Sequence, residues 1–270
     1  MKVQGKVVVV TGAGSGMGRE LTLELVKRGA LVAAVDMRAE TLEETKQLAL
    51  TAGGKVETFI LDVSDDAKVA ALPSAVAAKL GAADALINNA GIIQPFVMIK
   101  DLTVEAAAKV MNVNFHGPLM LTKAFLPGLL AKPEAYILNV SSMGSYAPVP
   151  GQTLYGATKA ALNMLTEGLR SELKDTKVNL TLVWPGAIGT NISANSGVSF
   201  GSGELTEAQK KAAARVTAPA AAGKMIVDAI ESNARRIYVG SDAKMMGNLI
   251  RLAPDFAANL IYKNMKSLLG

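Results

Sequence analysis

The sequence predicts an α/β fold in which a seven-stranded, doubly wound parallel sheet carries helices on both of its faces. The 270 residues are 50% apolar, which suits one large domain with an aliphatic core. Short runs that are apolar throughout alternate with longer stretches of helical periodicity, and strands buried on both faces read in this way. The 25 glycines follow no repeating period, so a collagen-like chain is excluded.

The predicted elements alternate along the chain. Residues 6–10 form an apolar strand, residues 17–27 a helix and residues 31–35 a second strand, with glycines between the first two. The later elements repeat this order, and they are the strands at 56–61, 84–87, 136–140, 179–183 and 237–240 and the helices at 67–80, 104–130 and 152–173. Because helices join these strands, we expect them to pair in parallel in a doubly wound sheet.

Two segments depart from this alternation. Residues 191–204 are rich in Ser, Gly and Asn, which predicts a mobile loop after the sixth strand and, in function, a lid. Residues 245–269 place apolar side chains at helical spacing on both sides of Pro254, which predicts two short amphipathic helices. We therefore expect one domain at 1–240 and a C-terminal amphipathic helical extension of that domain at 241–270.

The composition excludes several classes of protein. The chain has no cysteine, which rules out disulfides, thiolate nucleophiles and cysteine-bound metal. A Ser-His-Asp hydrolase would depend on the one histidine, His116, and no Gly-x-Ser-x-Gly elbow presents a serine, so we assign His116 no chemistry. The net charge of +5 is dispersed, without a polybasic tract for nucleic acid. Residues 1–10 contain only a short valine run, too short for a signal peptide or a membrane span, so we expect a cytoplasmic protein.

A glycine-rich run, Thr-Gly-Ala-Gly-Ser-Gly-Met-Gly, joins the first strand to the first helix. Gly12, Gly16 and Gly18 would let backbone N–H groups approach a pyrophosphate at the helix N-terminus. Asp36 ends the second strand 18 residues after Gly18, as a carboxylate that binds an adenosine ribose does. This combination predicts a Rossmann-type dinucleotide site, and the carboxylate favours NAD because it repels the 2′-phosphate of NADP. Arg38 leaves the use of both cofactors open, although a solvated charge at a helix entry is the simpler interpretation.

A tyrosine and a lysine four residues apart predict proton transfer. Tyr155 and Lys159 lie on one face of the predicted helix, and Ser142 stands thirteen residues before the tyrosine. A tyrosine that works at neutral pH needs its pKa lowered from about 10 to about 7, and a cation about 4 Å away supplies that much stabilisation of the phenolate. We therefore expect Lys159 to make Tyr155 a general acid or base.

These motifs, taken in order, resemble the short-chain dehydrogenase/reductase family in its shorter, single-domain branch. The resemblance covers residues 6–240 and includes the run Asn-Asn-Ala-Gly at 88–91, Asp-Val at 62–63 and Pro-Gly at 185–186. It implies an oxidoreductase that acts on CH-OH donors and transfers a hydride between nicotinamide and a secondary alcohol or ketone. NAD is the implied cofactor, NADP is possible, and no metal is needed.

The resemblance also implies roles for individual residues. The implied catalytic residues are Ser142, which binds the substrate oxygen, Tyr155, which exchanges its proton, Lys159, which holds the nicotinamide ribose and lowers the tyrosine pKa, and Asn114, which holds a water that links the lysine to solvent. The implied cofactor contacts are Gly12, Ser15, Gly16, Met17, Gly18, Asp36, Asp62, Val63, Asn89, Ala90, Gly91, Tyr155, Lys159, Pro185, Gly186, Ile188 and Thr190. Two alternatives stay open: Asn114 can instead make a helix-bending hydrogen bond, and the run at 88–91 can be chiefly structural.

The substrate and the assembly are less constrained. Apolar residues after the predicted strands favour a lipophilic substrate such as a hydroxysteroid, a longer-chain ketone or a hydroxyacyl group, but each is equally plausible as local core; they are Ile92, Phe96, Met143, Val149, Ile188 and Ile192. The resemblance implies a homodimer or homotetramer that pairs through the helices at 104–130 and 152–173. A catalytically silent, dinucleotide-sensing binding protein is the alternative function. The basic tail leaves a membrane surface as a partner, which we favour less than packing within the protein or its oligomer.

Overall fold

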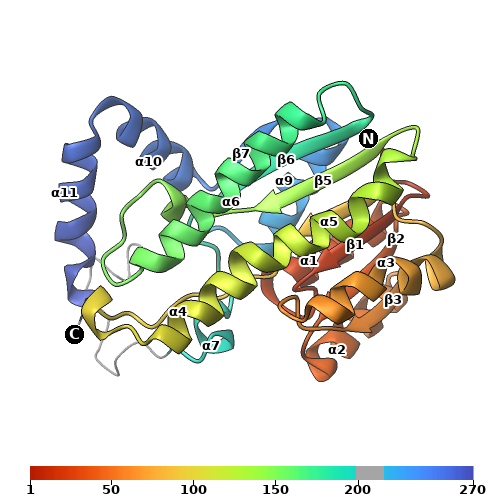
Figure 1. The fold of residues 1–270 in the computed structure, drawn as a ribbon, viewed down its shortest axis with the longest axis horizontal. Helices are drawn as coiled ribbons and strands as arrows, with labels where there is room; N and C mark the ends of the chain where they lie inside the picture. Colours follow the sequence, from red (N-terminus) through yellow and green to blue (C-terminus); the bar gives the residue numbers. More distant parts are fainter. Residues whose placement is uncertain (199–215, 270) are drawn as a thin grey trace.

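The structure of the protein, a computed structural model, describes residues 1–198 and 216–269, without the side chains of Ser267 and Leu268 (Figure 1). In this part of the chain seven parallel strands form one sheet in the order β3-β2-β1-β4-β5-β6-β7. They are β1 (Val7–Thr11), β2 (Leu31–Asp36), β3 (Lys55–Ile60), β4 (Ala85–Asn88), β5 (Ala135–Val140), β6 (Val178–Pro185) and β7 (Arg236–Val239). The strand order reverses between β1 and β4, and ligands of doubly wound sheets bind beside such a reversal. The predicted fold class is confirmed.

Helices cover both faces of the sheet (Figure 1). One face carries α1 (Gly16–Lys27), α2 (Ala39–Thr51) and α9 (Pro219–Glu231), and the other carries α3 (Asp66–Leu80), α5 (Gly117–Leu130) and α6 (Thr153–Glu172). Along β1, Val8 and Val10 belong to the first core, and Val7 and Val9 belong to the second. A strand that is apolar throughout therefore supplies two cores, which is why its sequence lacks alternation.

Smaller elements connect and extend these layers. They are the 3-10 turns Ile99–Asp101, Met143–Ser145 and Lys266–Leu269, the π turn Asn112–His116, and the helices α4 (Val104–Met111), α7 (Ile192–Asn195), α10 (Ser241–Leu252) and α11 (Pro254–Met265). The predicted helix at 104–130 is thus α4 and α5 with the π turn between them. The predicted loop at 191–204 contains the helical turn α7, and residues 199–204 lie outside the described residues.

Helices α2 and α9 are missing from the predicted elements, although only α2 lacks a strong apolar stripe. In α2 the buried residues are Leu42, Thr45 and Ala49, so only one large apolar side chain faces the core. Helix α9 packs closely on α1 through small residues, and a Cβ atom on Gly223 would lie 3.0 Å from the backbone of Glu20. The same helix buries Ile226, Val227 and Ile230 at helical spacing, so its sequence carries a signal that the prediction missed.

The two C-terminal helices are those predicted around Pro254, although α10 begins earlier, at Ser241. Helix α10 packs on loops that follow the strands. Its Asp242 accepts a hydrogen bond from the backbone N–H of Ala187 at 2.7 Å, and the hydroxyl of Tyr146 donates to the carbonyl oxygen of Ala243 at 2.8 Å. Of the helices in the described residues, none combines the length and the apolar character that a membrane span requires.

Candidate active site

A cavity of about 530 Å³ lies where the strands end, and it gathers nearly all of the predicted site residues. Those that line it are Gly12, Ser15, Gly16, Met17, Gly18, Asp36, Asp62, Val63, Asn89, Ala90, Gly91, Ser142, Tyr155, Lys159, Pro185, Gly186, Ile188 and Thr190. Asn114 lies behind the lining, next to Gly91. Motifs spread along the chain therefore meet beside the reversal of strand order.

The glycine-rich loop forms a backbone cradle at the start of α1. Gly12 and Gly16 have φ angles of +68° and +52°, which favour glycine. A Cβ atom on Gly18 would lie 2.0 Å from the carbonyl oxygen of Gly12, so only glycine fits there. Ser15 precedes the helix but makes no side-chain cap. A helix N-terminus with this much bare backbone suits a pyrophosphate, so the loop fits a dinucleotide.

Asp36 is fixed at the end of β2, where its side chain is 8% exposed. Its Oδ2 accepts a hydrogen bond from the N–H of Gly14 at 2.9 Å, and its Oδ1 accepts one from the N–H of Arg38 at 3.0 Å. Each carboxylate oxygen has a further acceptor position, and the residue lines the cavity. The arrangement suits the hydroxyls of a ribose.

Two predicted cofactor contacts also hold the loops in place. The amide Nδ2 of Asn89 donates to the carbonyl oxygen of Thr11 at 2.8 Å, and the Thr11 hydroxyl accepts from the N–H groups of Asn89 and Ala90. These bonds join the ends of β1 and β4. Asp62 accepts from the N–H and the hydroxyl of Ser64 and so closes the turn before α3. These side chains therefore shape the cavity by fixing its backbone.

Tyr155 and Lys159 lie one turn apart on α6, and both line the cavity. Lys159 is 4% exposed, and its ammonium donates to the carbonyl oxygen of Val140 at 3.0 Å. Ser142 and the phenol share one corner of the cavity, because a Cβ atom on Gly144 would lie 3.4 Å from Ser142 Oγ and 3.3 Å from Tyr155 Cε1. The structure thus brings together the three residues that the spacing singled out.

Burial controls the protonation of this pair. Burial raises the pKa of Tyr155, and the Ser142 hydroxyl acts in the opposite direction by stabilising the phenolate. Burial also lowers the pKa of Lys159 to about 8, since the ammonium loses hydration. The expectation that Lys159 brings the Tyr155 pKa to about 7 is not met, because burial acts most strongly on this pKa and the opposing effect comes from Ser142.

Asn114 lies in the π turn and is completely buried. Its Oδ1 accepts from the N–H of Ile92 at 2.9 Å, while its Nδ2 donates to the carbonyl oxygen of Ile92 at 2.9 Å and to Thr158 Oγ1 at 3.2 Å. Thr158 in turn donates to the carbonyl oxygen of Tyr155. Asn114 therefore connects the loop after β4 to the first turns of α6, and its side chain bonds other segments instead of bending its own helix.

Gln94 is a residue that the sequence patterns missed. It is fully buried, and its Oε1 accepts a hydrogen bond from the backbone N–H of Tyr155 at 2.9 Å. The residue before α6, Gln152, gives that helix no side-chain cap and donates instead to the Gln94 carbonyl oxygen at 2.8 Å. Gln94 thus caps the catalytic helix from another loop. The available signal is a polar residue within the apolar run Ile-Ile-Gln-Pro-Phe.

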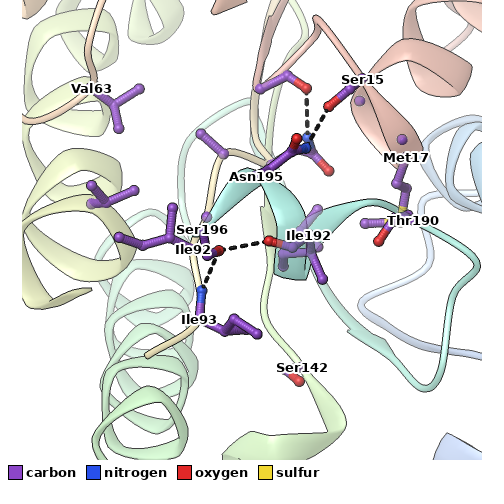
Figure 2. A pocket seen from close by; sticks show the side chains of 18 of the residues that line it. Ser15, Met17, Val63, Ile92, Ile93, Ser142, Thr190, Ile192, Asn195 and Ser196 are labelled. Atoms are coloured by element: carbon purple, nitrogen blue, oxygen red, sulfur yellow. Dashed lines mark hydrogen bonds between the residues drawn. The ribbon is translucent and has the colours of Figure 1, made fainter. Parts of the chain in front are cut away.

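The segment with α7 closes part of the cavity and was predicted only as a loop. Figure 2 shows its two contacts: Asn195 donates to Ser15 Oγ at 2.9 Å, and Ser196 Oγ accepts from the N–H of Ile93 at 3.0 Å. Ser196 also donates to the carbonyl oxygen of Ile192 at 2.7 Å. Through these bonds α7 reaches both the glycine-rich loop and the loop after β4.

Comparisons with known proteins agree with this site. Residues 6–198 match the family model described as short chain dehydrogenase. The chain is 36% identical over 254 residues to the Mycobacterium tuberculosis protein SadH, which covers 92% of this chain and 91% of that one. A short chain dehydrogenase/reductase from Burkholderia phymatum, solved with NAD, superimposes with a TM-score of 0.81 at 25% identity over 93% of this chain and 96% of its own.

A second solved structure broadens the likeness. The short chain dehydrogenase from Burkholderia cenocepacia J2315, solved in complex with NADP, has a TM-score of 0.79 at 28% identity, over 97% of this chain and 99% of its own. The family model covers the glycine-rich loop, the cavity and the Tyr155–Lys159 pair. The fold, the site and these matches together show that the chain belongs to the short-chain dehydrogenase/reductase family of oxidoreductases.

Proposed function

We propose that the protein is an NAD-dependent oxidoreductase that moves a hydride between nicotinamide and a secondary alcohol or ketone. The observation that supports this most strongly is that Ser142 and Tyr155 meet in the same cavity as the glycine-rich loop, with Lys159 buried beside them. A backbone cradle suits a dinucleotide, and a phenol next to a hydroxyl suits a carbonyl oxygen.

The dinucleotide, when bound, supplies or accepts the hydride. Gly12, Gly16 and Gly18 would hold its pyrophosphate, and Asp36 would bind its adenosine ribose. Lys159 would bind the ribose next to the nicotinamide. These assignments fit the loop, since a Cβ atom on Gly18 would collide with the carbonyl oxygen of Gly12 and distort the cradle.

Tyr155 carries the proton in this proposal. During carbonyl reduction its phenol donates a proton to the substrate oxygen, while the Ser142 hydroxyl donates a hydrogen bond to the same oxygen. The Lys159 ammonium stabilises the phenolate that remains. Because burial raises the Tyr155 pKa and leaves that of Lys159 at about 8, both groups are protonated at neutral pH, which suits the donor role of Tyr155. Alcohol oxidation uses the same groups in reverse.

NAD is the proposed cofactor because Asp36 lies where a 2′-phosphate would meet a carboxylate. One similar protein was solved with NAD and another with NADP, so the likeness to them does not decide between the two cofactors. The preference for NAD therefore rests on this chain's own residues. Asp36 is held by two backbone N–H groups and cannot turn away without breaking them. Its charge therefore favours the unphosphorylated ribose.

A lipophilic substrate, a homo-oligomeric assembly and a cytoplasmic location complete the proposal. Of the six apolar residues considered for the substrate pocket, those that line the cavity are Ile92, Ile188 and Ile192. Phe96, Met143 and Val149 are not in the described lining, so the apolar surface is smaller than expected. Three exposed apolar side chains lie on the helices predicted to pair and would be covered if copies paired through them; they are Val104, Leu130 and Met164.

The experiment is a comparison of the wild-type protein with Tyr155→Phe. We expect the wild type to reduce members of a panel of lipophilic ketones with NADH, and the variant to lose about 10²–10⁴-fold in kcat with an unchanged Kd for NADH, because only the proton donor is removed. NADH fluorescence follows binding and turnover in the same assay. Full activity in Tyr155→Phe would contradict the role of Tyr155. NADH binding without turnover of any alcohol or ketone would instead support the silent dinucleotide-sensing alternative.

A further inference from the structure

Asn195 joins α7 to two residues beside the site proposed for the adenosine ribose. Its Oδ1 accepts a hydrogen bond from Arg38 Nη1 at 2.6 Å. Its Nδ2 donates to Ser15 Oγ at 2.9 Å, as Figure 2 shows. All three residues line the cavity. Asn195 thus connects the glycine-rich loop with the arginine that follows Asp36.

We propose that Asn195 is a cofactor-specificity residue, which holds the Arg38 guanidinium toward α7 and away from the place of a 2′-phosphate. This inference rests on the proposed function and refines its preference for NAD. An arginine close to the strand-end carboxylate can accommodate the 2′-phosphate of NADP, so Arg38 could oppose the effect of Asp36. The direction in which Arg38 points then decides how strongly NADP is rejected.

Asn195 restrains the guanidinium more closely than Asp36 does. The Arg38 Nε lies 4.0 Å from Asp36 Oδ1, at the outer limit of an ion pair, whereas Arg38 Nη1 lies 2.6 Å from Asn195 Oδ1. The arginine side chain is 41% exposed, so packing leaves it considerable rotamer freedom. A single short hydrogen bond is therefore enough to set its direction.

Asn195 accepts a hydrogen bond from an N–H group of Arg38 that a bound phosphate could otherwise use. Arginine binds phosphate best through two parallel N–H groups of its planar fork. The bond from Nη1 to Asn195 takes one of the five N–H groups and directs the guanidinium toward α7, so fewer donors face a phosphate beside Asp36. The Asp36 carboxylate then repels the phosphate, and Arg38 does not fully offset this repulsion. The unfavourable contact disfavours NADP and leaves NAD, which lacks the phosphate, unaffected.

The chemistry of the three groups allows one orientation of the Asn195 amide. A guanidinium only donates, so it must face Oδ1, and the NH₂ group then faces the Ser15 hydroxyl, which accepts. Alanine at this position would remove both bonds. Aspartate would keep the acceptor for Arg38 and add a negative charge. The two substitutions are thus expected to change specificity in opposite directions.

Ser196 provides a matched control on the same segment. Its hydroxyl accepts from the N–H of Ile93 and donates to the carbonyl oxygen of Ile192, at 3.0 and 2.7 Å. The substitution Ser196→Ala loosens α7 at the loop after β4 and removes no bond to Arg38. Any effect of this loosening should change the affinities for NAD⁺ and NADP⁺ equally.

The test is isothermal titration calorimetry of NAD⁺ and NADP⁺ with the wild-type protein and its variants. We expect Asn195→Ala to raise the ratio of NADP⁺ to NAD⁺ affinity about tenfold, the value of one charge-assisted hydrogen bond to a phosphate. Asn195→Asp should lower the ratio about threefold, and Ser196→Ala should leave it unchanged. Adding Arg38→Ala to Asn195→Ala should cancel the gain. Melting temperatures of the free variants establish that each is folded.

Two results would overturn the inference. One is an equal change of both affinities in Asn195→Ala, which would make the residue only an anchor of α7. The other is a gain in NADP⁺ affinity that persists in the Arg38→Ala/Asn195→Ala double variant. If the wild type bound neither dinucleotide, the proposed function itself would fail, and this outcome is distinct from unchanged ratios in a protein that binds both.

Discussion

The two ends of the cavity are built from different parts of the chain. At the cofactor end, the loop from Gly12 to Gly18 is made of consecutive residues, and its shape depends on absent side chains. At the catalytic end, α6 is held by polar side chains from distant segments, such as Gln94 on the N–H of Tyr155 and Asn114 on Thr158. The first end depends on absent side chains and the second on hydrogen bonds between distant segments.

This difference predicts opposite sensitivities. An added methyl group should damage the cofactor end, because Gly18 has no room for one. Loss of a polar partner should damage the catalytic end, because the groups left behind are buried and cannot bond to water. Substitutions at each end therefore test which kind of change that end tolerates.

The largest effect is expected from Gly18→Ala. Its Cβ would lie 2.0 Å from the carbonyl oxygen of Gly12, so the loop must move and the Kd for NADH should rise about a hundredfold, with stability lowered by about 1–3 kcal/mol. NADH fluorescence titration measures the Kd, and thermal unfolding measures the stability. The control is Gly128→Ala in α5, where a Cβ meets nothing within 4 Å. Equal NADH affinity in the two variants would contradict a cradle shaped by missing side chains.

The next effect concerns pH at the catalytic end. Burial lowers the pKa of Lys159 to about 8, so the ammonium that stabilises the Tyr155 phenolate is present below that pH and lost above it. The kcat/KM for carbonyl reduction should therefore be level below pH 8 and fall about tenfold per unit above it. In Lys159→Arg the fall near pH 8 should disappear, since a guanidinium stays charged. A wild-type profile that stays level to pH 9.5 would show that Lys159 does not set this rate.

A smaller effect is expected at Gln94, which we regard as a positioning residue. Gln94→Leu should lower kcat about fivefold and leave the Kd for NADH unchanged, because the N–H of Tyr155 loses its acceptor and the phenol is less well placed. Gln94→Glu keeps the acceptor at a helix N-terminus, which favours a carboxylate, and should restore most of the activity. Stopped-flow single-turnover experiments measure the rate of the chemical step separately from the Kd for NADH. A parallel loss of NADH affinity in Gln94→Leu would instead indicate a general structural role.

The sequence predicted the glycine-rich loop better than the contacts that hold α6, because the loop is built from consecutive residues and those contacts join distant segments. The glycine spacing, the strand before it and Asp36 lie close together in the chain, so local patterns reveal them. Apolar runs likewise predicted every strand of the sheet within a few residues. By contrast, α2 was missed because it buries a single large apolar residue, whereas α9 was missed although it buries Ile226, Val227 and Ile230 at helical spacing.

Contacts between distant residues were beyond such patterns. The bond of Gln94 to α6 joins residues far apart in the chain, as does the bond of Arg38 to Asn195. The pKa of Tyr155 was misjudged because spacing reveals the neighbouring ammonium but not the burial that opposes it. Residue types and spacing thus predict which groups meet, whereas their protonation depends on the surrounding packing.

The π turn between α4 and α5 limits how this part of the chain can change in length. A π turn holds one residue more than an α-helical turn, so deleting one residue from it would restore a regular helix without turning α5 away from the sheet. The deletion would instead move Asn114 from the place where its side chain bonds both backbone groups of Ile92. Single-residue insertions and deletions should therefore be tolerated before Val104 or after Leu130 rather than between them.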